Sequence, residues 1–475
     1  MGPRPPIGAS AIAGTVLFAL VLAVPGILAD PDTLWQIHTG DLILRTGAIP
    51  HADPFSYTAQ GERWFAHEWL AETLMALANR TGGWRGVMTL TAAAAGVTMG
   101  LLLYHLRRFM ALLPAVAVML LGIANCAGSL LARPHVLAWP CLELWCAGLV
   151  IARARGRAPS WWLLPVMVVW VNLHGSFMLG LLLPLAFLIE AAIEAGPAWR
   201  QPVIQWARFT AAAWAAALLN PDTFEALLFP FQLLGMQNLN WIGEWSPADF
   251  SAFHPLELTI LVLLGIGLMG RLTVPPFRLL MLLGLVHMAL KHWRHDQLLG
   301  LIGALILAEA IGRLAPPEPA AVARRMAVPL VAALAAILAL TGRILMPLGY
   351  EPGGAVFATL EKVPAVLREK PVLNDYGFGA LLIAHGDRPF IDSRADMYGD
   401  AFLGRFRQIA DGNPGALTAA LEQYHVAWTI FPPDAPVLLL LDQLPGWHRL
   451  LTEPAAVVHM RDDPGESRIS VQTAR

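Results

Sequence analysis

Asp30 and Asp32 are the acidic residues whose position in the sequence is most suggestive of chemistry. Only Pro31 separates them, and they follow directly after an uncharged stretch from Ile7 to Ala29. An ionised carboxylate can accept the proton of an attacking hydroxyl group, so either residue could act as a general base. The alternative is structural, because aspartates often cap the positive N-terminal end of a helix.

Two basic clusters, residues 133–135 (Arg-Pro-His) and 291–295 (Lys-His-Trp-Arg-His), could bind an anion. Arginine binds phosphate oxygens in a bidentate manner and keeps its charge. Arg133 and Arg294 are therefore the preferred phosphate ligands, with Lys291 and His295 as further candidates. The alternative is that these cations lie at the ends of membrane helices and extend to lipid head groups.

Six other residues could line a substrate cavity, three pairs of neighbouring polar or aromatic side chains: His67 with Glu68, Asn172 with His174, and Glu244 with Trp245. A tryptophan beside a carboxylate suits the apolar face and the hydroxyl groups of a carbohydrate. A polar pair between two apolar segments is costly unless it is hydrogen-bonded or lines a wet cavity. Interhelical hydrogen bonds and solvated loops are the alternative roles.

The sequence predicts no dedicated metal site. The motif His67-Glu-Trp-Leu70 lacks the second histidine of a zinc-protease helix, and the three cysteines, Cys126, Cys141 and Cys146, lie inside apolar segments. A divalent cation is compatible with the carboxylates near Asp30 but is not required. Glycine-rich phosphate loops, nucleophile elbows and nucleic-acid-binding patches are absent from the sequence.

The residues described so far must be positioned by a framework that lies mostly in lipid. The chain has 475 residues, of which 56% are hydrophobic and 14% charged, and its mean hydropathy is +0.56. These values exclude an ordinary soluble domain. We expect about eleven transmembrane helices, at residues 7–29, 86–104, 109–132, 134–151, 161–171, 175–189, 209–220, 256–270, 279–290, 298–311 and 326–342. Residues 161–189 could instead form one bent span.

The arginine distribution predicts the orientation of these spans. Arginines occupy alternate connections, which are therefore expected to be cytoplasmic: Arg4; Arg107 and Arg108; Arg153, Arg155 and Arg157; Arg200; Arg271 and Arg278; Arg313, Arg324 and Arg325. This orientation places the N-terminus inside. It places residues 30–85, 221–255 and 291–296, and everything after about residue 348, outside.

Two regions outside the spans have a regular pattern. In the first outer loop, residues 30–85, we expect an amphipathic helix from Asp32 to Leu44 and a second helix that begins at His67 and runs to Leu77. From Gly349 the charge density rises, and strand-like runs appear at residues 371–373, 389–392, 426–431 and 455–460. The sequence thus predicts a transmembrane domain over 1–348, including the first loop, and a small α/β domain over 349–475.

Several motifs resemble those of one family of membrane proteins. They are residues 30–40 (DPDTLWQIHTG), 47–50 (GAIP), 53–57 (DPFSY), 67–70 (HEWL), 170–177 (WVNLHGSF), 220–221 (NP), 244–247 (EWSP), 374–379 (NDYGFG), 390–394 (FIDSR) and 397–398 (MY). Together they resemble a group of bacterial proteins related to the C-type (GT-C) glycosyltransferases. This superfamily includes the protein O-mannosyltransferases and the lipid A aminoarabinose transferases.

The resemblance implies a polytopic helical GT-C fold with an extracytoplasmic C-terminal α/β domain, in the bacterial inner membrane. It also implies an activity: transfer of a sugar from a polyprenyl-phosphate-linked donor to a hydroxyl of a glycan, lipid or protein acceptor at the outer face. In relatives with an Asp-Glu pair the aspartate leads. Here Asp32 matches it but is followed by Thr33, and Asp30 is the second choice.

Two other functions are compatible with the sequence. The first is a non-catalytic relative that binds a lipid-linked glycan and acts as a scaffold in the cell envelope. The second is a transporter, which is disfavoured because the chain contains no repeated half.

Overall fold

The computed structural model describes residues 5–317, 327–345 and 353–462. The chain folds into two compact units. Unit 1 contains residues 1–29, 67–234 and 240–350, and unit 2 contains residues 30–66, 235–239 and 351–475. Arg4, Arg324, Arg325 and the expected domain boundary at Gly349 lie outside the described residues.

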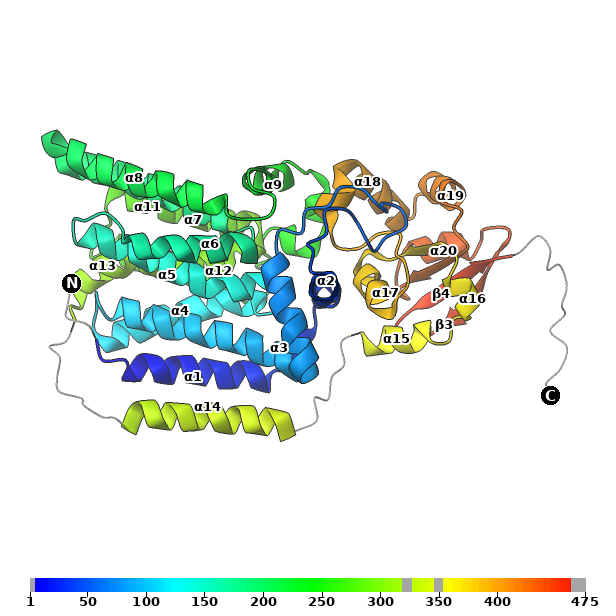
Figure 1. Cartoon of the computed structure of the whole chain (residues 1–475), viewed down its shortest axis with the longest axis horizontal. Helices are drawn as coiled ribbons and strands as arrows, with labels where there is room; N and C mark the ends of the chain where they lie inside the picture. Colours follow the sequence, from blue (N-terminus) through cyan, green and yellow to red (C-terminus); the bar gives the residue numbers. More distant parts are fainter. Residues whose placement is uncertain (1–4, 318–326, 346–352, 463–475) are drawn as a thin grey trace. The chain divides into compact units, whose positions relative to one another are not determined.

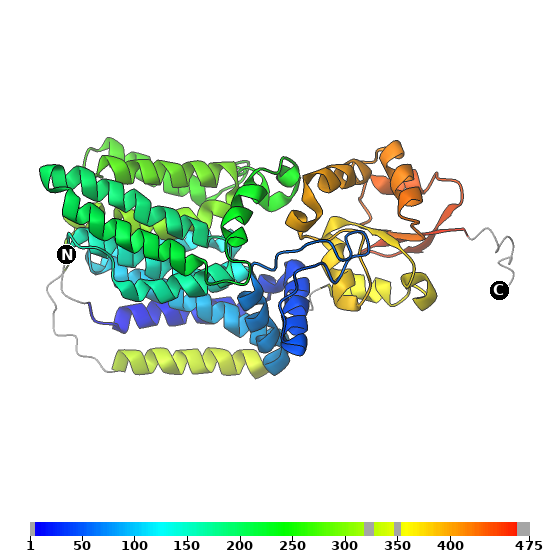
Figure 2. The same ribbon diagram turned by 45° about the horizontal axis from the view of Figure 1, so that its top comes forward.

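Unit 1 is built from α-helices, the longer of which lie side by side in both ribbon views (Figures 1 and 2). They are α1 (Gly8–Ala23), α3 (Trp69–Leu106), α4 (Leu112–Cys126), α5 (Pro134–Ala154), α6 (Leu164–Leu173), α7 (Phe177–Ala195), α8 (Arg200–Ala217), α9 (Glu225–Leu234), α10 (Pro255–Leu268), α11 (Pro276–Lys291), α12 (Asp296–Leu298), α13 (Ala304–Leu314) and α14 (Ala327–Leu345). A π-helical turn, Leu299–Gly303, joins α12 to α13.

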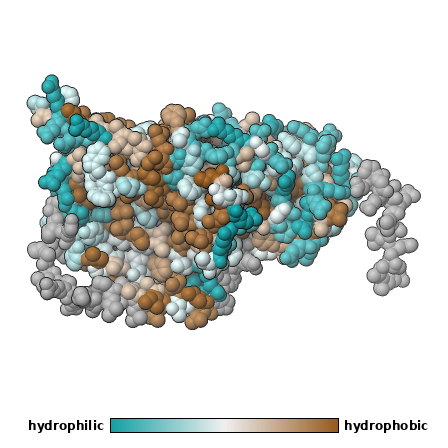
Figure 3. All heavy atoms as spheres, in the orientation of Figure 1, coloured by the Kyte–Doolittle hydropathy of each residue, from teal (hydrophilic) through white to brown (hydrophobic). Residues whose placement is uncertain are grey.

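Each of the expected apolar segments lies on a helix of unit 1. Among the described residues, five helical segments are long and apolar enough to cross a membrane: 69–106, 112–129, 134–154, 177–198 and 293–314. Figure 3 shows hydrophobic residues gathered over the middle of this helical unit. Residues 161–189 form two helices, α6 and α7, separated at His174. The count of eleven spans stays a prediction.

Glycines allow α1 and α3 to pack backbone against backbone. A Cβ atom added at Gly14 would lie 2.6 Å from the carbonyl oxygen of Gly96, and one at Gly96 would lie 2.7 Å from that of Gly14. Gly100, one turn further along α3, approaches the carbonyl of Ser10 in the same way. Small residues four positions apart are typical of close helix crossings in membranes, where van der Waals packing drives association.

Buried ion pairs join the ends of α5, α7, α11 and α13. Glu190 of α7 lies 3.2 Å from Nε of Arg153 and 2.7 Å from Nε of Arg278. Arg278 also lies 3.0 Å from Glu309, which pairs with Arg313. Arginines from three separate connections therefore meet at one end of the helical unit, as their expected location on one side of the membrane requires.

Unit 2 combines helices with a four-stranded mixed sheet. Its helices are α2 (Asp32–Thr46), α15 (Gly354–Leu360), α16 (Ala365–Arg368), α17 (Gly379–His385), α18 (Ala395–Ala410), α19 (Pro414–Gln423) and α20 (Val437–Leu441). Its strands are β1 (Val372–Asn374), β2 (Trp428–Phe431), β3 (Trp447–Thr452) and β4 (Val457–Arg461), in the order β1-β2-β4-β3. β1 and β2 are parallel, and the other pairs are antiparallel.

Two features of unit 2 differ from the sequence-based expectation. Residues 389–392 form no strand, and β3 was not expected. Residues 30–66 pack with residues 351–475 in unit 2, whereas residues 67–85 belong to unit 1, and the domain boundary at residues 348/349 stays a prediction.

A buried ion cluster holds these distant segments of unit 2 together. Arg394 pairs with Asp392 through two nitrogens and with Asp53 at 2.8 Å. Its guanidinium group also lies 4.7 Å from the ring centre of Trp64. Removing one partner of such a buried pair commonly costs about 3–5 kcal/mol.

Candidate functional site

Two arginines and one glutamate converge in unit 1, and we call Arg133, Arg294 and Glu244 the arginine clamp. Nη1 of Arg133 lies 2.9 Å from one carboxylate oxygen of Glu244, and Nη1 of Arg294 lies 2.9 Å from the other. The three side chains are 16%, 22% and 26% exposed, so they are partly accessible.

Local structure fixes each member of the clamp. Arg133 precedes Pro134, the first residue of α5, and has an extended backbone, as a residue before proline prefers. Arg294 lies in a 3-10 turn, residues 293–295, directly after α11. Glu244 lies in another 3-10 turn, 243–245. The Trp293 indole N–H donates to the carbonyl of Gly243 at 2.8 Å and ties the two turns together.

The Trp245 ring lies against the guanidinium group of Arg294. The guanidinium carbon lies 4.3 Å from the ring centre, a cation–π contact. The Trp245 ring is only 7% exposed, and its backbone carbonyl accepts a hydrogen bond from His292. Because Trp245 is buried and its ring lies against Arg294, the ring does not present the open face that stacking on a sugar would require.

The charge of Glu244 is stabilised by its partners. Burial opposes ionisation of this carboxyl group, but the charges of Arg133 and Arg294 outweigh it and lower its pKa to about 2. Glu244 is therefore an anion at any physiological pH and not a proton donor.

Glu68 lies between two histidines in the same unit. Its Oε1 atom is 3.7 Å from Nε2 of His67 and 3.5 Å from Nε2 of His174. The backbone N–H of Ser176 donates to Nδ1 of His174 at 3.1 Å, so a neutral His174 carries its proton on Nε2, toward Glu68. Burial, followed by His135 and Arg294, holds the pKa of His174 well below its usual value.

His135 connects this carboxylate to the clamp. Its ring centre lies 5.9 Å from that of His174, and its Nε2–H donates to the carbonyl of Ser129 at 2.6 Å. The charges of Arg133, Arg294 and Glu244 all act on this ring. The sequence favours the arginines of the basic clusters over His135 as phosphate ligands. The sequence signal that could have identified His135 is its position two residues after Arg133, in the first turn of α5.

Asn172 has a structural role in this arrangement. Its amide oxygen accepts from the indole N–H of Trp69 at 2.7 Å, and its amide nitrogen donates to the carbonyls of Val168 and Leu219 at 2.7 and 2.9 Å. These bonds join α6 to the start of α3 and to the residues after α8. Of the two roles considered from the sequence, the interhelical hydrogen bond is the one observed.

The remaining basic candidates lie next to the clamp in sequence. Lys291 ends α11 and is exposed. His295 packs its ring against Trp245 and His292, at 6.4 and 5.7 Å between ring centres. Their proposed role in phosphate binding stays a prediction.

The two aspartates expected to act as bases lie in unit 2. Asp30 accepts a hydrogen bond from the backbone N–H of Asp32 at 2.9 Å, directly before α2. The N-cap of α2 is Pro31, so this bond is a local turn contact before the helix, and the assignment of Asp30 as the second-choice base stays a prediction. Asp32 begins α2 and is 9% exposed. Its assignment as the base stays a prediction.

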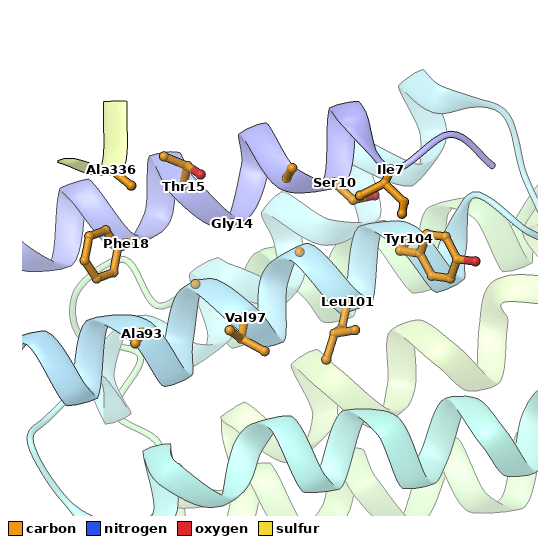
Figure 4. Close-up of a pocket in the computed structure, with 13 residues that line it drawn as sticks. Ile7, Ser10, Gly14, Thr15, Phe18, Ala93, Val97, Leu101, Tyr104 and Ala336 are labelled. Atoms are coloured by element: carbon orange, nitrogen blue, oxygen red, sulfur yellow. The ribbon is translucent and has the colours of Figure 1, made fainter. Parts of the chain in front are cut away.

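Within the described residues, no group of three or more His, Cys, Asp or Glu side chains could hold a metal ion. A groove of about 570 Å³ lies elsewhere in unit 1, between α1, α3 and Ala336 of α14. Figure 4 shows Phe18 and Ala336 near one end of it and Ile7 and Tyr104 near the other. Its lining is mostly apolar and includes no residue of the clamp.

Comparison with known proteins identifies the fold. No family model and no curated protein matches the sequence. Solved structures do match: the oligosaccharyltransferase AglB of Archaeoglobus fulgidus, in complex with an inhibitory peptide and a dolichol-phosphate, has a TM-score of 0.50 at 12% identity, over 89% of this chain and 69% of that one. ArnT of Cupriavidus metallidurans bound to undecaprenyl phosphate has a TM-score of 0.50 at 15% identity, over 95% and 97%.

The apo form of the Archaeoglobus fulgidus oligosaccharyltransferase gives a similar result, with a TM-score of 0.51 at 11% identity over 88% of this chain and 69% of that one. At these identities the likeness concerns the fold alone. The chain thus shares the mostly helical fold of AglB and ArnT, as expected, and the C-terminal domain stays a prediction.

Proposed function

We propose that this chain is a membrane glycosyltransferase that moves a sugar from a polyprenyl-phosphate-linked donor to an acceptor hydroxyl. The observation that carries the proposal is the arginine clamp, two cations that converge in a chain with the GT-C fold. Two proteins with this fold bind the corresponding lipids: AglB is in complex with a dolichol-phosphate and ArnT with undecaprenyl phosphate.

The reaction requires a base and a site for the leaving phosphate. The acceptor oxygen forms a bond to the anomeric carbon of the sugar while the bond from that carbon to the phosphate oxygen breaks. The hydroxyl proton passes to a carboxylate, for which Asp32 is our assignment, and the bonding electrons leave with the polyprenyl phosphate. Negative charge grows on the phosphate in the transition state, where fixed cations lower the barrier.

The other residues have supporting roles in this proposal. Arg133 and Arg294 bind the phosphate, with Lys291 and His295 nearby in sequence. Glu68, His67 and His174 form the polar wall of the cavity. The protein would lie in the bacterial inner membrane with its N-terminus and the buried arginine network on the cytoplasmic side. The C-terminal domain and the clamp would then lie on the outer side.

One observation favours the scaffold as a second candidate. Asp30 accepts a hydrogen bond from the backbone N–H of Asp32, so one of the two carboxylates considered for catalysis already has a local structural use. A scaffold would retain the arginine clamp for binding the lipid-linked glycan and would need no base.

Transfer of labelled sugar by the purified full-length chain, from a panel of polyprenyl-phosphate donors, tests the proposal. We expect transfer by the wild type, loss of both donor binding and transfer in the double variant Arg133→Ala/Arg294→Ala, and loss of transfer alone in Asp32→Asn. Arg271→Ala is the matched control, because this arginine is exposed in the connection between α10 and α11.

Each result decides between the candidates. Donor binding without transfer in the wild type would favour the scaffold. Donor binding that survives the double variant would contradict the role of the clamp.

A further inference from the structure

Glu244 is an anion in the middle of a site that is proposed to bind anions, and this placement needs an explanation. We propose that Glu244 sets the net charge of the arginine clamp so that the site selects donors carrying one phosphate over donors carrying a diphosphate. The inference rests on the proposed function, since it concerns the donor of that reaction.

Glu244 neutralises one of the two guanidinium charges without occupying all of their donors. Each arginine contributes one Nη1 atom, at 2.9 Å, to a different carboxylate oxygen. Among the described residues, Glu244 is the one side chain that accepts a hydrogen bond from the Arg294 guanidinium. An arginine has five N–H donors, so Arg294 keeps donors for a ligand while its pair with Glu244 stays intact.

The guanidinium group of Arg294 is also held in place without a ligand. Trp245 lies against its face at 4.3 Å, and the side chain remains 22% exposed. An arginine fixed by stacking loses little side-chain entropy when it binds an anion. The clamp is thus preorganised, and Glu244 can stay bound while a phosphate oxygen approaches the remaining donors.

The neighbouring histidines do not restore the charge that Glu244 removes. Burial and the nearby cations keep His174 neutral near pH 7. His135 faces both arginines, and a further positive charge there would be repelled by each of them. Glu68, 3.5 Å from His174, adds a carboxylate on that side. The three side chains of the clamp therefore carry one net positive charge between them.

That charge matches one class of lipid-linked sugar. A sugar joined to a lipid through one phosphate is a phosphodiester with a single negative charge, whereas a diphosphate link carries two. The first leaves the clamp close to neutral. The second leaves at least one unbalanced negative charge beside Glu244 in a partly buried site, where charge interactions are stronger than in bulk water.

Two sugar-free probes that differ by one phosphate test the selectivity by itself: farnesyl methyl phosphate and its diphosphate analogue. Their affinities are measured for the full-length chain in lipid nanodiscs. We expect the wild type to bind the monophosphate at least about tenfold more tightly. In Glu244→Gln the diphosphate should bind more tightly than in the wild type, and the preference should fall by about tenfold. Glu257→Gln, the same change at an exposed position of α10, should leave the preference unchanged.

Equal binding of the two probes by the wild type, or a preference for the diphosphate, would overturn the inference while leaving the proposed function intact. An unchanged preference in a folded Glu244→Gln protein would also overturn it. If Glu244→Gln does not fold, the wild-type ratio decides the matter. If the wild type binds neither probe, the phosphate site itself is wrong, and the proposed function fails with the inference.

Discussion

Asn172 and Arg294 are both polar residues near helix ends, but they differ in how much of their bonding capacity the protein uses. Asn172 makes three hydrogen bonds to its own chain, and its oxygen and nitrogen are both engaged. Arg294 makes one side-chain hydrogen bond within the described residues and stacks on Trp245. The residue with unused donors is the better candidate for ligand binding, since a buried amide that is already satisfied gains little from a ligand.

The charge states of the clamp predict how phosphate binding depends on pH. The folded-state pKa of Glu244 is lowered to about 2, so its ion pairs are fully present above its ordinary pKa of 4.5 and are lost only as pH falls through about 2. Burial, followed by His135 and Arg294, lowers the pKa of His174 well below its usual value, so this histidine adds no charge near pH 7. We expect the affinity for farnesyl methyl phosphate to be constant within about twofold between about pH 5.5 and 8.

The affinity can be followed by titration calorimetry at fixed ionic strength. A step centred near pH 6.5 would contradict this expectation, because it would mean that a histidine charges when the phosphate binds.

At this scale the sequence predicted residue types better than partners. Arg133 and Arg294 were identified because each lies at the end of an apolar segment. Glu244 was assigned to the sugar because its neighbour in sequence is Trp245. Its pairing with Arg133 joins residues that are 111 positions apart, and no local pattern contains that information. His135 ranked below the arginines because arginine binds phosphate in a bidentate manner and keeps its charge. Its nearness to His174 depends on tertiary packing, which no local pattern contains.

Among the elements, the crossing of α1 and α3 leaves little room for added side-chain atoms. Both backbones approach at Gly14 and Gly96, where an added Cβ atom would lie less than 3 Å from a carbonyl oxygen. We expect Gly96→Leu to force the helices apart and to destabilise the protein by at least about 1–3 kcal/mol. Thermal unfolding of the purified chain, followed by tryptophan fluorescence, measures the effect.

Gly284→Leu provides the matched control. Gly284 lies within α11, and a Cβ atom there would meet nothing within 4 Å. A melting temperature lowered equally in both variants would contradict the close-crossing explanation.

Elements embedded in lipid could be predicted from hydropathy, and elements of the second unit only in part. A long apolar segment in lipid must satisfy its backbone hydrogen bonds internally, which favours a helix, and the expected apolar segments do lie on helices. Residues 389–392 are buried like a strand, and three of the four are apolar, but the backbone N–H of Phe390 donates to the Asn374 side chain instead of to a neighbouring strand. β3 was missed because its central residues, His448 and Arg449, are exposed and charged or polar.

For the molecule as a whole, each end of unit 1 carries its own cluster of arginines paired with glutamate. One end carries the buried network around Arg278 and Glu190, and the other carries the clamp. Because helices that run in alternate directions connect them, the positive-inside rule predicts that the first end faces the cytoplasm. We expect a cysteine at exposed Arg157 to be protected from a membrane-impermeant maleimide in intact spheroplasts, and cysteines at exposed Asp249 and Asp411 to be labelled.

The labelling is done in a background in which the three natural cysteines are replaced by alanine, and all three positions should react after detergent lysis. Labelling of Arg157→Cys in intact cells would reverse the proposed orientation.

The composition of unit 2 has a consequence for how the protein is synthesised. Trp35 donates a hydrogen bond to Ser393, 358 residues later, and Asp53 pairs with Arg394. At a translation rate of about 5–20 residues per second, the early segment is complete roughly 20–70 seconds before its partners exist. Throughout that interval Trp35 and Trp64, both buried in the finished protein, lack the Arg394 side chain that lies against both rings. Nonsense mutations near the end of the reading frame should therefore leave an aromatic loop near its beginning open to proteases and to aggregation.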